Sequence, residues 1–420
     1  MKNEKKALVP ALRFPEFRDA GEWKILQIET VLSVRNDKRL PSHDLPLFSL
    51  TIEKGVTAKS GRYNRKFLVR DQKAKRYKLV LPGDVVYNPS NLRWGAINKS
   101  KVDYPVVVSP IYEVLYLTDA RAIDETFIAT ALMRPQQIAR FITKGQGTLV
   151  ERIAVKIEDF LDTAIEVPES LHEQQKIADC LSSLDDLIAA HTEKLDALKT
   201  HKKGLMQQLF PREGETVPRL RFAEFRDAGE WEPRRLSKFI EERNQYPKGK
   251  LPLYSLTIEA GIAPKTERYE RSFLVKNEED AYKLVRPDDF AYNPMNLRFG
   301  AIARHSGSDE VVVSKYYNIF YCDSSVDSRF CEIFFKSPGM IAYYDDVATG
   351  SLIEKRRVHF SEFLKFDIRF PQLEEQRKIA DCLSSLDTLI AAHTEKLDAL
   401  KTHKKGLMQQ LFPSPEETDI

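Results

Sequence analysis

The sequence lacks the features that mark several classes of protein. No stretch approaches the roughly 20 consecutive apolar residues that a membrane-spanning helix needs. The opening MKNEKKALVP has charge but no apolar run behind it, as a secretory signal would have. A P-loop and a glycine-rich cofactor loop are also missing. We therefore expect a cytoplasmic protein that binds no cofactor of its own.

Cysteine is scarce. The four cysteines, Cys180, Cys322, Cys331 and Cys382, form no CxxC pair, and the histidines complete no zinc-site spacing. This excludes a zinc-ribbon type of fold and predicts no metal site. Cys180 and Cys382 occupy equivalent places in two repeats, which indicates a packing role.

Net charge is also small, at +3, but its distribution is uneven. Residues 55–102 hold 12 Lys and Arg against 2 acidic residues, whereas residues 261–308 hold 8 against 7. A concentrated basic stretch in a nearly neutral chain is typical of phosphate attraction. A solvated surface is the alternative.

What the sequence does contain is an internal repeat. The segment LRFPEFRDAGEW, Leu12 to Trp23, returns as LRFAEFRDAGEW, Leu220 to Trp231. Lys176 to Pro211 returns as Lys378 to Pro413 over 36 residues, with the one change that Asp186 becomes Thr388. The halves therefore run about 1–211 and 212–420, and each is a body of roughly 160 residues followed by a nearly invariant segment.

The invariant segment is predicted to be a coiled-coil helix. Apolar residues recur at alternating steps of four and three, a heptad pattern. The seam consists of Ile177, Leu181, Leu184, Ile188, His191, Leu195 and Leu198, continued by Lys202, Leu205 and Leu209, and in the copy of Ile379, Leu383, Leu386, Ile390, His393, Leu397 and Leu400, continued by Lys404, Leu407 and Leu411. We interpret the histidines as polar seam residues that fix register, with a pH switch or ligand site as the alternative, and the seam lysines as side chains that reach out to solvent.

The two helices are expected to pair with each other in antiparallel fashion. At about 1.5 Å per residue, 36 residues span about 54 Å. The second body leaves one helix near Phe210 and enters the other near Leu373, and these points are neighbours only in an antiparallel pair. Residues near Leu12 should then pack by the end of the second helix, as residues near Leu220 pack by the end of the first.

The predicted fold class is α+β: two similar domains of mixed helix and strand, joined by two long antiparallel helices in an intrachain coiled coil, with pseudo-twofold symmetry.

Within each body, VVYNP, PVVVSPIYEVLYL and AIEVP are predicted strands, and DETFIATALMRPQQIARFIT, from Asp124, is a predicted helix. The loop YNPSNLRWGAI, Tyr87 to Ile97, returns as YNPMNLRFGAI, Tyr292 to Ile302. Amides can read adenine and arginine can read guanine, although Asn-Pro and Gly also build tight loops and the aromatic residues could belong to the core.

The candidate DNA contacts follow from these patterns. Base contacts are expected from Asn88, Asn91, Arg93 and Trp94 and from Asn293, Asn296, Arg298 and Phe299. Phosphate contacts, which position rather than specify, are expected from Arg62, Tyr63, Lys66, Lys73, Lys75, Arg76 and Lys78 and from Arg268, Tyr269 and Arg271.

Taken together, these motifs resemble the specificity subunit of a type I restriction-modification system. The resemblance rests on the duplicated LRFxEFRDAGEW, on VPESLHEQQKIADCLSSLD and FPQLEEQRKIADCLSSLD, and on the helix end KKGLMQQLFP. It implies target-recognition domains at 1–169 and 212–371, conserved helices at 170–211 and 372–413, and a tail at 414–420. GQGTLVERI, Gly145 to Ile153, and ATGSLIEKRRV match the family's segment before the docking helix, with fewer basic residues than usual.

The resemblance also implies partners. These are double-stranded DNA, two adenine methyltransferase subunits that use S-adenosylmethionine, and restriction subunits that use ATP with Mg. A helix pair of about 54 Å equals roughly 16 base pairs at about 3.4 Å each, so two half-sites separated by unread base pairs are expected. Because the bodies resemble each other, we hypothesise that the half-sites are related and the target partly palindromic.

Two other functions are compatible with parts of the sequence. Asn88-Pro89 and Asn293-Pro294 are similar to the start of a DNA methyltransferase catalytic loop, but the second proline and the aromatic residue are missing. A stand-alone coiled-coil DNA-binding regulator is the alternative function, although it leaves the repeated outer faces of the helices without a purpose.

Overall fold

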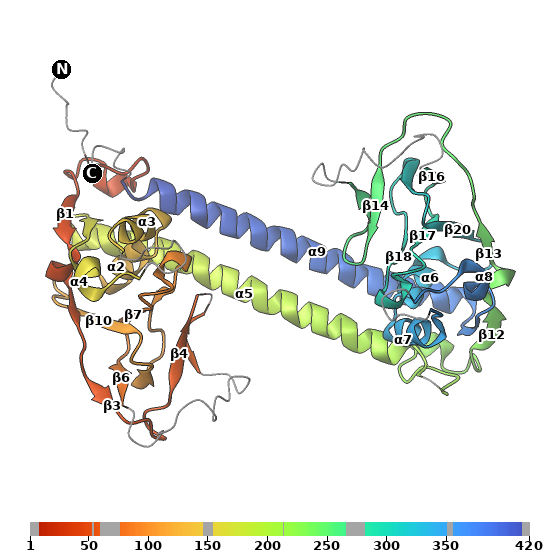
Figure 1. Ribbon diagram of the computed structural model, residues 1–420, viewed down its shortest axis with the longest axis horizontal. Helices are drawn as coiled ribbons and strands as arrows, with labels where there is room; N and C mark the ends of the chain where they lie inside the picture. The colour runs from red at the N-terminus through yellow and green to blue at the C-terminus, as the bar shows by residue number, and fades with distance from the viewer. Residues whose placement is uncertain are drawn as a thin grey trace. The chain divides into compact units, whose positions relative to one another are not determined.

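The computed structural model describes residues 8–52, 54–58, 76–145, 154–212, 214–265, 282–350 and 356–413. It consists of two compact units (Figure 1). The first unit is Met1–Ala190 with Leu397–Ile420, and the second is His191–Lys396. Each unit therefore contains one body and a part of both long helices, α5 (Leu171–Leu209) and α9 (Leu373–Gln410).

The first body is built on antiparallel strands. Its central sheet has the order β2-β10-β7-β8, and smaller sheets have the orders β1-β11, β3-β6-β9 and β4-β5. The strands are β1 (Lys24–Gln27), β2 (Leu32–Val34), β3 (Lys38–Arg39), β4 (Phe48–Thr51), β5 (Gly55–Ala58), β6 (Tyr77–Val80), β7 (Val85–Tyr87), β8 (Ile97–Lys99), β9 (Val106–Val108), β10 (Glu113–Leu117) and β11 (Ala164–Val167). The helices are α1 (Ile28–Val31), α2 (Glu125–Leu132), α3 (Pro135–Thr143) and α4 (Ile157–Leu161), with short turns η1 (Pro15–Phe17) and η3 (Leu92–Trp94).

The second body repeats this plan. Its central sheet has the order β13-β20-β17-β18, flanked by β12-β21, β16-β19 and β14-β15. The strands are β12 (Glu232–Arg235), β13 (Ile240–Glu242), β14 (Tyr254–Thr257), β15 (Gly261–Pro264), β16 (Tyr282–Val285), β17 (Phe290–Tyr292), β18 (Ile302–Arg304), β19 (Val311–Ser314), β20 (Asn318–Cys322) and β21 (Asp367–Phe370). The helices are α6 (Ser328–Phe335), α7 (Pro338–Val347) and α8 (Phe360–Phe363), with turns η5 (Ala223–Phe225), η6 (Leu236–Lys238) and η9 (Leu297–Phe299).

The predicted α+β class is confirmed, but two predicted elements are divided. The helix predicted from Asp124 is split into α2 and α3, because Pro135 has no N–H to continue α2 and instead begins α3. Its predicted acidic start is correct: the Asp124 carboxylate accepts the Phe127 N–H at 2.8 Å. PVVVSPIYEVLYL forms two strands, β9 and β10, joined by a turn in which the Tyr112 N–H donates to the Ser109 carbonyl at 3.1 Å.

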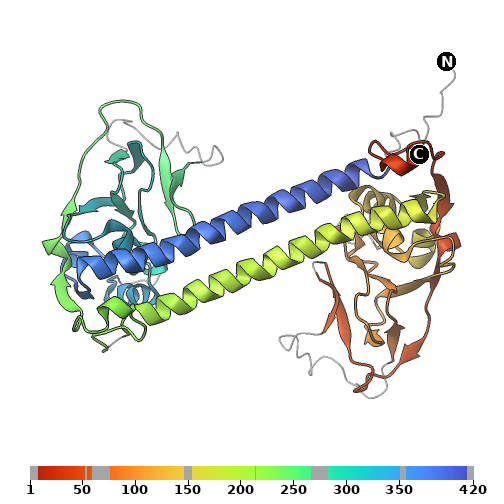
Figure 2. The same ribbon diagram turned by 180° about the vertical axis from the view of Figure 1, so that it is seen from behind.

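The long helices pack against each other in antiparallel fashion within each unit (Figures 1 and 2). In the first unit, Leu181 near the start of α5 shares a core with Leu411 just past the end of α9. In the second unit, Leu209 at the end of α5 shares a core with Ile379 near the start of α9. Every seam position from Ile177 to Leu209 and from Ile379 to Leu411 is buried or half-buried, so the heptad pattern did identify the contact face.

Charge complementarity favours this direction. Acidic residues dominate the first half of each helix segment and lysines its second half. Lys404 Nζ lies 2.5 Å from Asp185 Oδ1 in the first unit, and Lys202 Nζ lies 2.5 Å from Asp387 Oδ1 in the second. A parallel pair would instead set like charges side by side, which is unfavourable. The seam lysines, which were expected to reach out to solvent, therefore each pair with a carboxylate on the other helix and keep only 22% of the side chain exposed.

In each unit, the duplicated LRFxEFRDAGEW segment packs against the end of a long helix. Leu12 N–H donates to the Gln410 carbonyl at 2.9 Å in the first unit, and Leu220 N–H donates to the Gln208 carbonyl at 2.9 Å in the second. This is the packing that the antiparallel arrangement predicts. Trp23 and Trp231 are buried, with 4% and 1% of their surfaces exposed.

A buried ion pair fixes the same segment to the base of each long helix. Arg13 Nε and Nη2 donate to the two carboxylate oxygens of Glu173 at 2.8 and 2.7 Å, and Arg221 makes the same two bonds to Glu375. Hydrogen bonding to Glu375 raises the pKa of Arg221. Such bidentate pairs combine charge with defined geometry, and they explain why these residues recur in both copies.

The two seam histidines meet near the middle of the long helices. His191 Nδ1 lies 3.2 Å from His393 Nδ1 within the second unit, and both rings are half-buried in the seam. Two rings at this distance can share one hydrogen bond when at least one is neutral. This arrangement fits a polar pair that fixes helix register.

Candidate nucleic-acid interface

The loop after β7 is a closed turn. Asn88 N–H donates to the Ala96 carbonyl at 2.9 Å, and Asn91 N–H donates to the Asn88 carbonyl at 3.1 Å. Gly95 adopts φ +82°, a conformation that favours glycine. Leu92 is fully buried beneath the turn. The tip is therefore held by its own backbone before any ligand arrives.

The copy after β17 has the same construction. Asn293 N–H donates to the Ala301 carbonyl at 3.0 Å, Gly300 adopts φ +90°, and Leu297 is fully buried. Asn88 Oδ1 accepts from the Ser90 N–H and Asn293 Oδ1 accepts from the Met295 N–H, each at 3.1 Å. These two asparagine side chains therefore stabilise the turn, and their carbonyl oxygens are already engaged.

The aromatic residues of the loop are not part of the core. Trp94 exposes 63% of its surface and Phe299 exposes 53%. Each ring has the guanidinium of the preceding arginine beside it, with Arg93 Cζ 5.0 Å from the Trp94 ring centre and Arg298 Cζ 4.6 Å from that of Phe299. An exposed aromatic ring with an adjacent guanidinium is suited to stacking and to polar contact with a base edge.

Asn91 and Asn296 complete the exposed tip. Both residues are exposed, and within the described part of the chain neither side-chain amide makes a hydrogen bond. An unengaged amide can bind adenine through a donor and an acceptor at once. In each loop the second asparagine and the aromatic residue are therefore exposed, the arginine is half-buried, and Asn88 or Asn293 holds the turn.

The loop is braced from behind by the segment that leads to the long helix. Val155 N–H donates to the Pro89 carbonyl at 3.1 Å, and the buried Tyr87 hydroxyl donates to the Val155 carbonyl at 3.4 Å. In the copy, Val358 makes the same two contacts with Pro294 and Tyr292, at 3.0 Å each. Burial raises the pKa of both tyrosines, so both hydroxyls stay protonated and serve as donors.

The predicted phosphate contacts are only partly visible. Arg62, Tyr63, Lys66, Lys73 and Lys75, with Arg268, Tyr269 and Arg271, lie outside the described residues. Arg76 is exposed. The side chain of Lys78 is only 8% exposed, and its Nζ lies 2.5 Å from Glu113 Oε2, so a neighbouring carboxylate compensates its charge.

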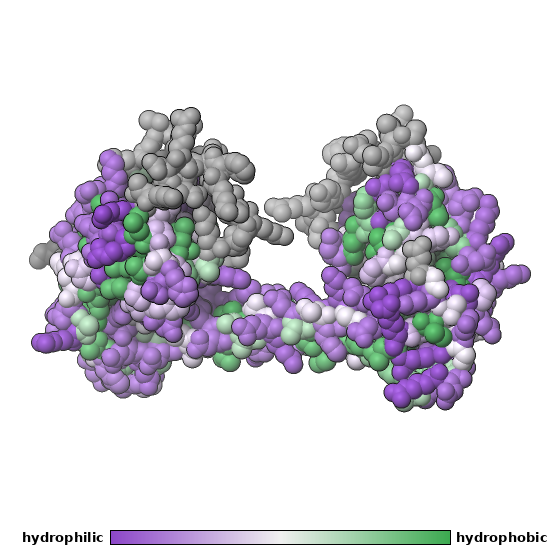
Figure 3. All heavy atoms as spheres, turned by 90° about the horizontal axis from the view of Figure 1, so that it is seen from below, coloured by the Kyte–Doolittle hydropathy of each residue, from purple (hydrophilic) through white to green (hydrophobic). Residues whose placement is uncertain are grey.

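The described residues contain neither a metal-binding cluster nor a membrane-spanning helix. In the described ranges, no group of three or more His, Cys, Asp or Glu is arranged to hold a metal ion. Of the described helices, none is both long and apolar enough to cross a bilayer. Figure 3 shows hydrophilic residues over much of the visible face of each unit, with hydrophobic residues in small groups.

Comparison with known proteins decides the family. The model of the type I restriction modification DNA specificity domain matches residues 21–200 and 352–402, more than half of the chain. The chain belongs to the type I restriction-modification DNA specificity family.

Relatives and a solved structure agree with this family. The chain is 22% identical over 316 residues to the type I restriction enzyme MjaVIII specificity subunit of Methanocaldococcus jannaschii, covering 70% of both chains. It is also 22% identical to the putative MjaX specificity subunit of that organism, covering 93% of both. The crystal structure of a type I restriction-modification system S subunit from M. genitalium superimposes with a TM-score of 0.62 at 13% identity, over 97% of this chain and 100% of that one, and supports the fold.

The two bodies also expose apolar residues that the sequence patterns did not identify. Ile52 in the β4–β5 turn is 53% exposed and lies beside Gly95 of the loop, and Ile258 in the β14–β15 turn is 48% exposed. Ile111 and Tyr316, at equivalent turns before β10 and β20, are 62% and 78% exposed. Comparing the two copies could have found them, because an apolar residue at both copies of a turn tip needs an explanation other than core packing.

Proposed function

We propose that this chain recognises a bipartite DNA target, with one half-site read by each body. This proposal is supported mainly by the exposed asparagine and aromatic side chains, with a half-buried arginine between them, that occur on the same braced loop in both units. Asn91 and Asn296 supply amides, Arg93 and Arg298 supply guanidinium groups, and Trp94 and Phe299 supply apolar surface of the kind that contacts a thymine methyl group. Two such loops in one chain support two half-sites.

The near-invariant helices support a second part of the proposal: the chain directs two equivalent methyltransferase subunits, and with them restriction subunits, to the target. Leu187 and Leu389 are off the seam and each exposes 48% of its surface. Identical exposed apolar residues on both helices fit identical partners, which would cover them. A stand-alone regulator would leave both leucines in water, so the partner-bound function is favoured.

Catalysis and cofactor binding are assigned to the partners. The Asn88-Pro89 turn uses its amide oxygen to hold the loop, and Asn293-Pro294 does the same. This is a structural use of the motif that suggested a methyltransferase. We therefore propose that S-adenosylmethionine, ATP and Mg are bound by the partner subunits and none of them by this chain.

The proposal is tested by mapping methylated adenines in cells that express this chain with its methyltransferase subunits. Two short half-sites at a fixed separation are expected. A double variant of one loop, N91A with W94A, should relax the sequence requirement at one half-site only, and N296A with F299A should relax it at the other. A single contiguous target, or relaxation of both half-sites by either variant, would overturn the proposal.

A further inference from the structure

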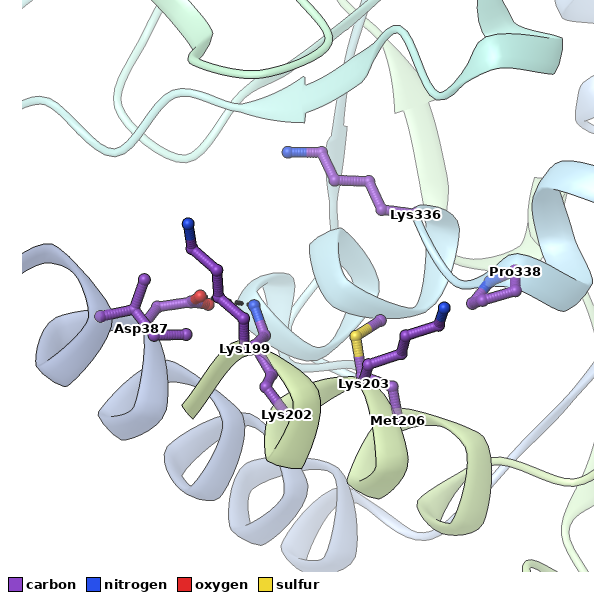
Figure 4. Close-up of a pocket in the computed structure, with 8 residues that line it drawn as sticks. Lys199, Lys202, Lys203, Met206, Lys336, Pro338 and Asp387 are labelled. Carbon is purple, nitrogen blue, oxygen red and sulfur yellow. Dashed lines mark hydrogen bonds and ion pairs between the residues drawn. The ribbon is translucent and has the colours of Figure 1, made fainter. Parts of the chain in front are cut away.

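A hollow of about 380 Å³ in the second unit is lined by an excess of positive charge (Figure 4). Lys199, Lys202 and Lys203 reach it from α5, and Lys336 reaches it from the turn between α6 and α7. The one carboxylate in the lining is Asp387 of α9. Four ammonium groups against one carboxylate leave a formal excess of three positive charges.

Part of this charge is uncompensated. Lys202 is paired with Asp387 at 2.5 Å, and Lys336 lies 3.1 Å from Glu332, whose other oxygen lies 3.3 Å from Arg304. Within the described ranges, Lys199 and Lys203 make no ion pair. Figure 4 shows Lys199 and Lys336 extending into the space between α5 and the end of α6, while Lys202 is turned towards Asp387. Flexible lysines around a hollow are suited to an anion with no fixed orientation.

The hollow also lies close to the candidate reading loop. Pro338 at its rim begins α7, and Asp345 farther along α7 lies 3.3 Å from the Arg298 guanidinium of the loop. Seven residues of helix span about 10 Å, which is about three base-pair steps of a duplex at roughly 3.4 Å each. A duplex read by the Arg298 loop would therefore bring a backbone phosphate within reach of the lysines.

We propose that Lys199, Lys203 and Lys336 bind neighbouring DNA backbone phosphates next to the half-site read by the second body. This inference rests on the proposed function and extends it to residues outside the recognition loops. The contact is independent of base sequence, because lysine contributes a point charge rather than a pattern of donors and acceptors. The positive end of the α7 dipole adds to the attraction.

The first body supplies a matched comparison. Its equivalent residues include Lys401, Lys405 and Pro135, but Met133 occupies the place of Lys336. The variant K336M therefore introduces a residue that the same fold already accommodates. The converse variant, M133K, adds the missing charge to the first unit.

The test measures target-DNA affinity of the complete complex with its methyltransferase subunits as salt is raised. Each lost phosphate contact reduces the slope of log affinity against log salt by about 0.9, so the advantage of the unaltered complex over K336M should shrink about 3.5-fold between about 50 and 200 mM salt. The double variant K199Q with K203Q should reduce the slope by more. M133K should increase it, and K365Q, at an exposed lysine paired with Glu362 outside the hollow, should leave it unchanged.

Several outcomes would overturn the inference. An unchanged slope for both K336M and K199Q with K203Q, in a complex that still binds its target specifically, would overturn the phosphate site alone. Weaker binding of the methyltransferase subunits with an unchanged slope would assign the lysines to a protein partner instead. A folded complex that binds no target DNA would overturn the phosphate site and the proposed function together.

Discussion

The two bodies share a framework but differ in how they distribute charge. In the first, Lys78 is buried against Glu113; in the second, Asn318 replaces that glutamate opposite Lys283. In the second, Asp345 holds Arg298, and Ile142 is the equivalent residue in the first. The buried turns, tyrosine donors and arginine–glutamate pairs are common to both. The two copies of one fold therefore keep the same framework and differ in local charge at these two positions.

The buried tryptophan that ends each duplicated segment, Trp23 or Trp231, should stabilise its own unit separately. Replacing Trp231 by alanine removes a ring packed between Phe210 and Phe330 and should destabilise the second unit by about 3–5 kcal/mol. Trp23→Ala should do the same to the first unit. Hydrogen exchange resolved by peptide measures both. Equal loss of protection in both units from either variant would contradict two separately stabilised bodies.

The exposed loop residues should affect DNA binding rather than folding. Trp94→Ala should weaken target binding by about 1–3 kcal/mol, the usual range for one base contact. Phe299→Ala should act in the same way at the other half-site. Binding to duplexes altered in one half-site at a time separates the two effects, with thermal unfolding as the control. Unchanged affinity for both variants would remove the aromatic residues from the interface.

Lys78 should contribute to the stability of the first body, whereas its equivalent Lys283 should contribute little to that of the second. Lys78→Met leaves the carboxylate of Glu113 without its partner and should lower the free energy of unfolding by about 1–3 kcal/mol. Lys283→Met, at a position with no equivalent glutamate, should change it by less than about 0.5 kcal/mol. Denaturant unfolding measures the difference. Equal destabilisation by both variants would show that the ion pair with Glu113 does not distinguish Lys78 from Lys283.

The smallest expected effect is on the helix pair. Asp185→Lys sets two lysines together in the first unit and should cost about 0.5–1 kcal/mol, since the pair is partly exposed and solvent screens it. Adding Lys404→Asp restores opposite charges and should recover most of the loss, as should the matching exchange at Asp387 and Lys202. Failure of the double variant to recover would show that packing alone sets the helix direction.

Much of the fold could be predicted because its signals are local or repeated. The seam from Ile177 needs only a periodicity, and the antiparallel direction follows from where the second body joins the helices. The loop at Asn88 was found because it occurs twice. Contacts between distant residues could not be predicted: Lys78 meets Glu113 across 35 residues and Arg13 meets Glu173 across 160. Sequence patterns identify such residues as charged, but only the fold shows whether a partner compensates them.

The most direct test of the proposed bipartite recognition is to change the length of the helices that join the two bodies. One heptad inserted in α5 between Leu184 and Leu198, with the matching heptad in α9, keeps the seam in register and adds about 10 Å to each helix. A methylated-adenine map should then show both half-sites unchanged and the unread gap longer by about three base pairs. Altered half-sites with the original gap would contradict the account.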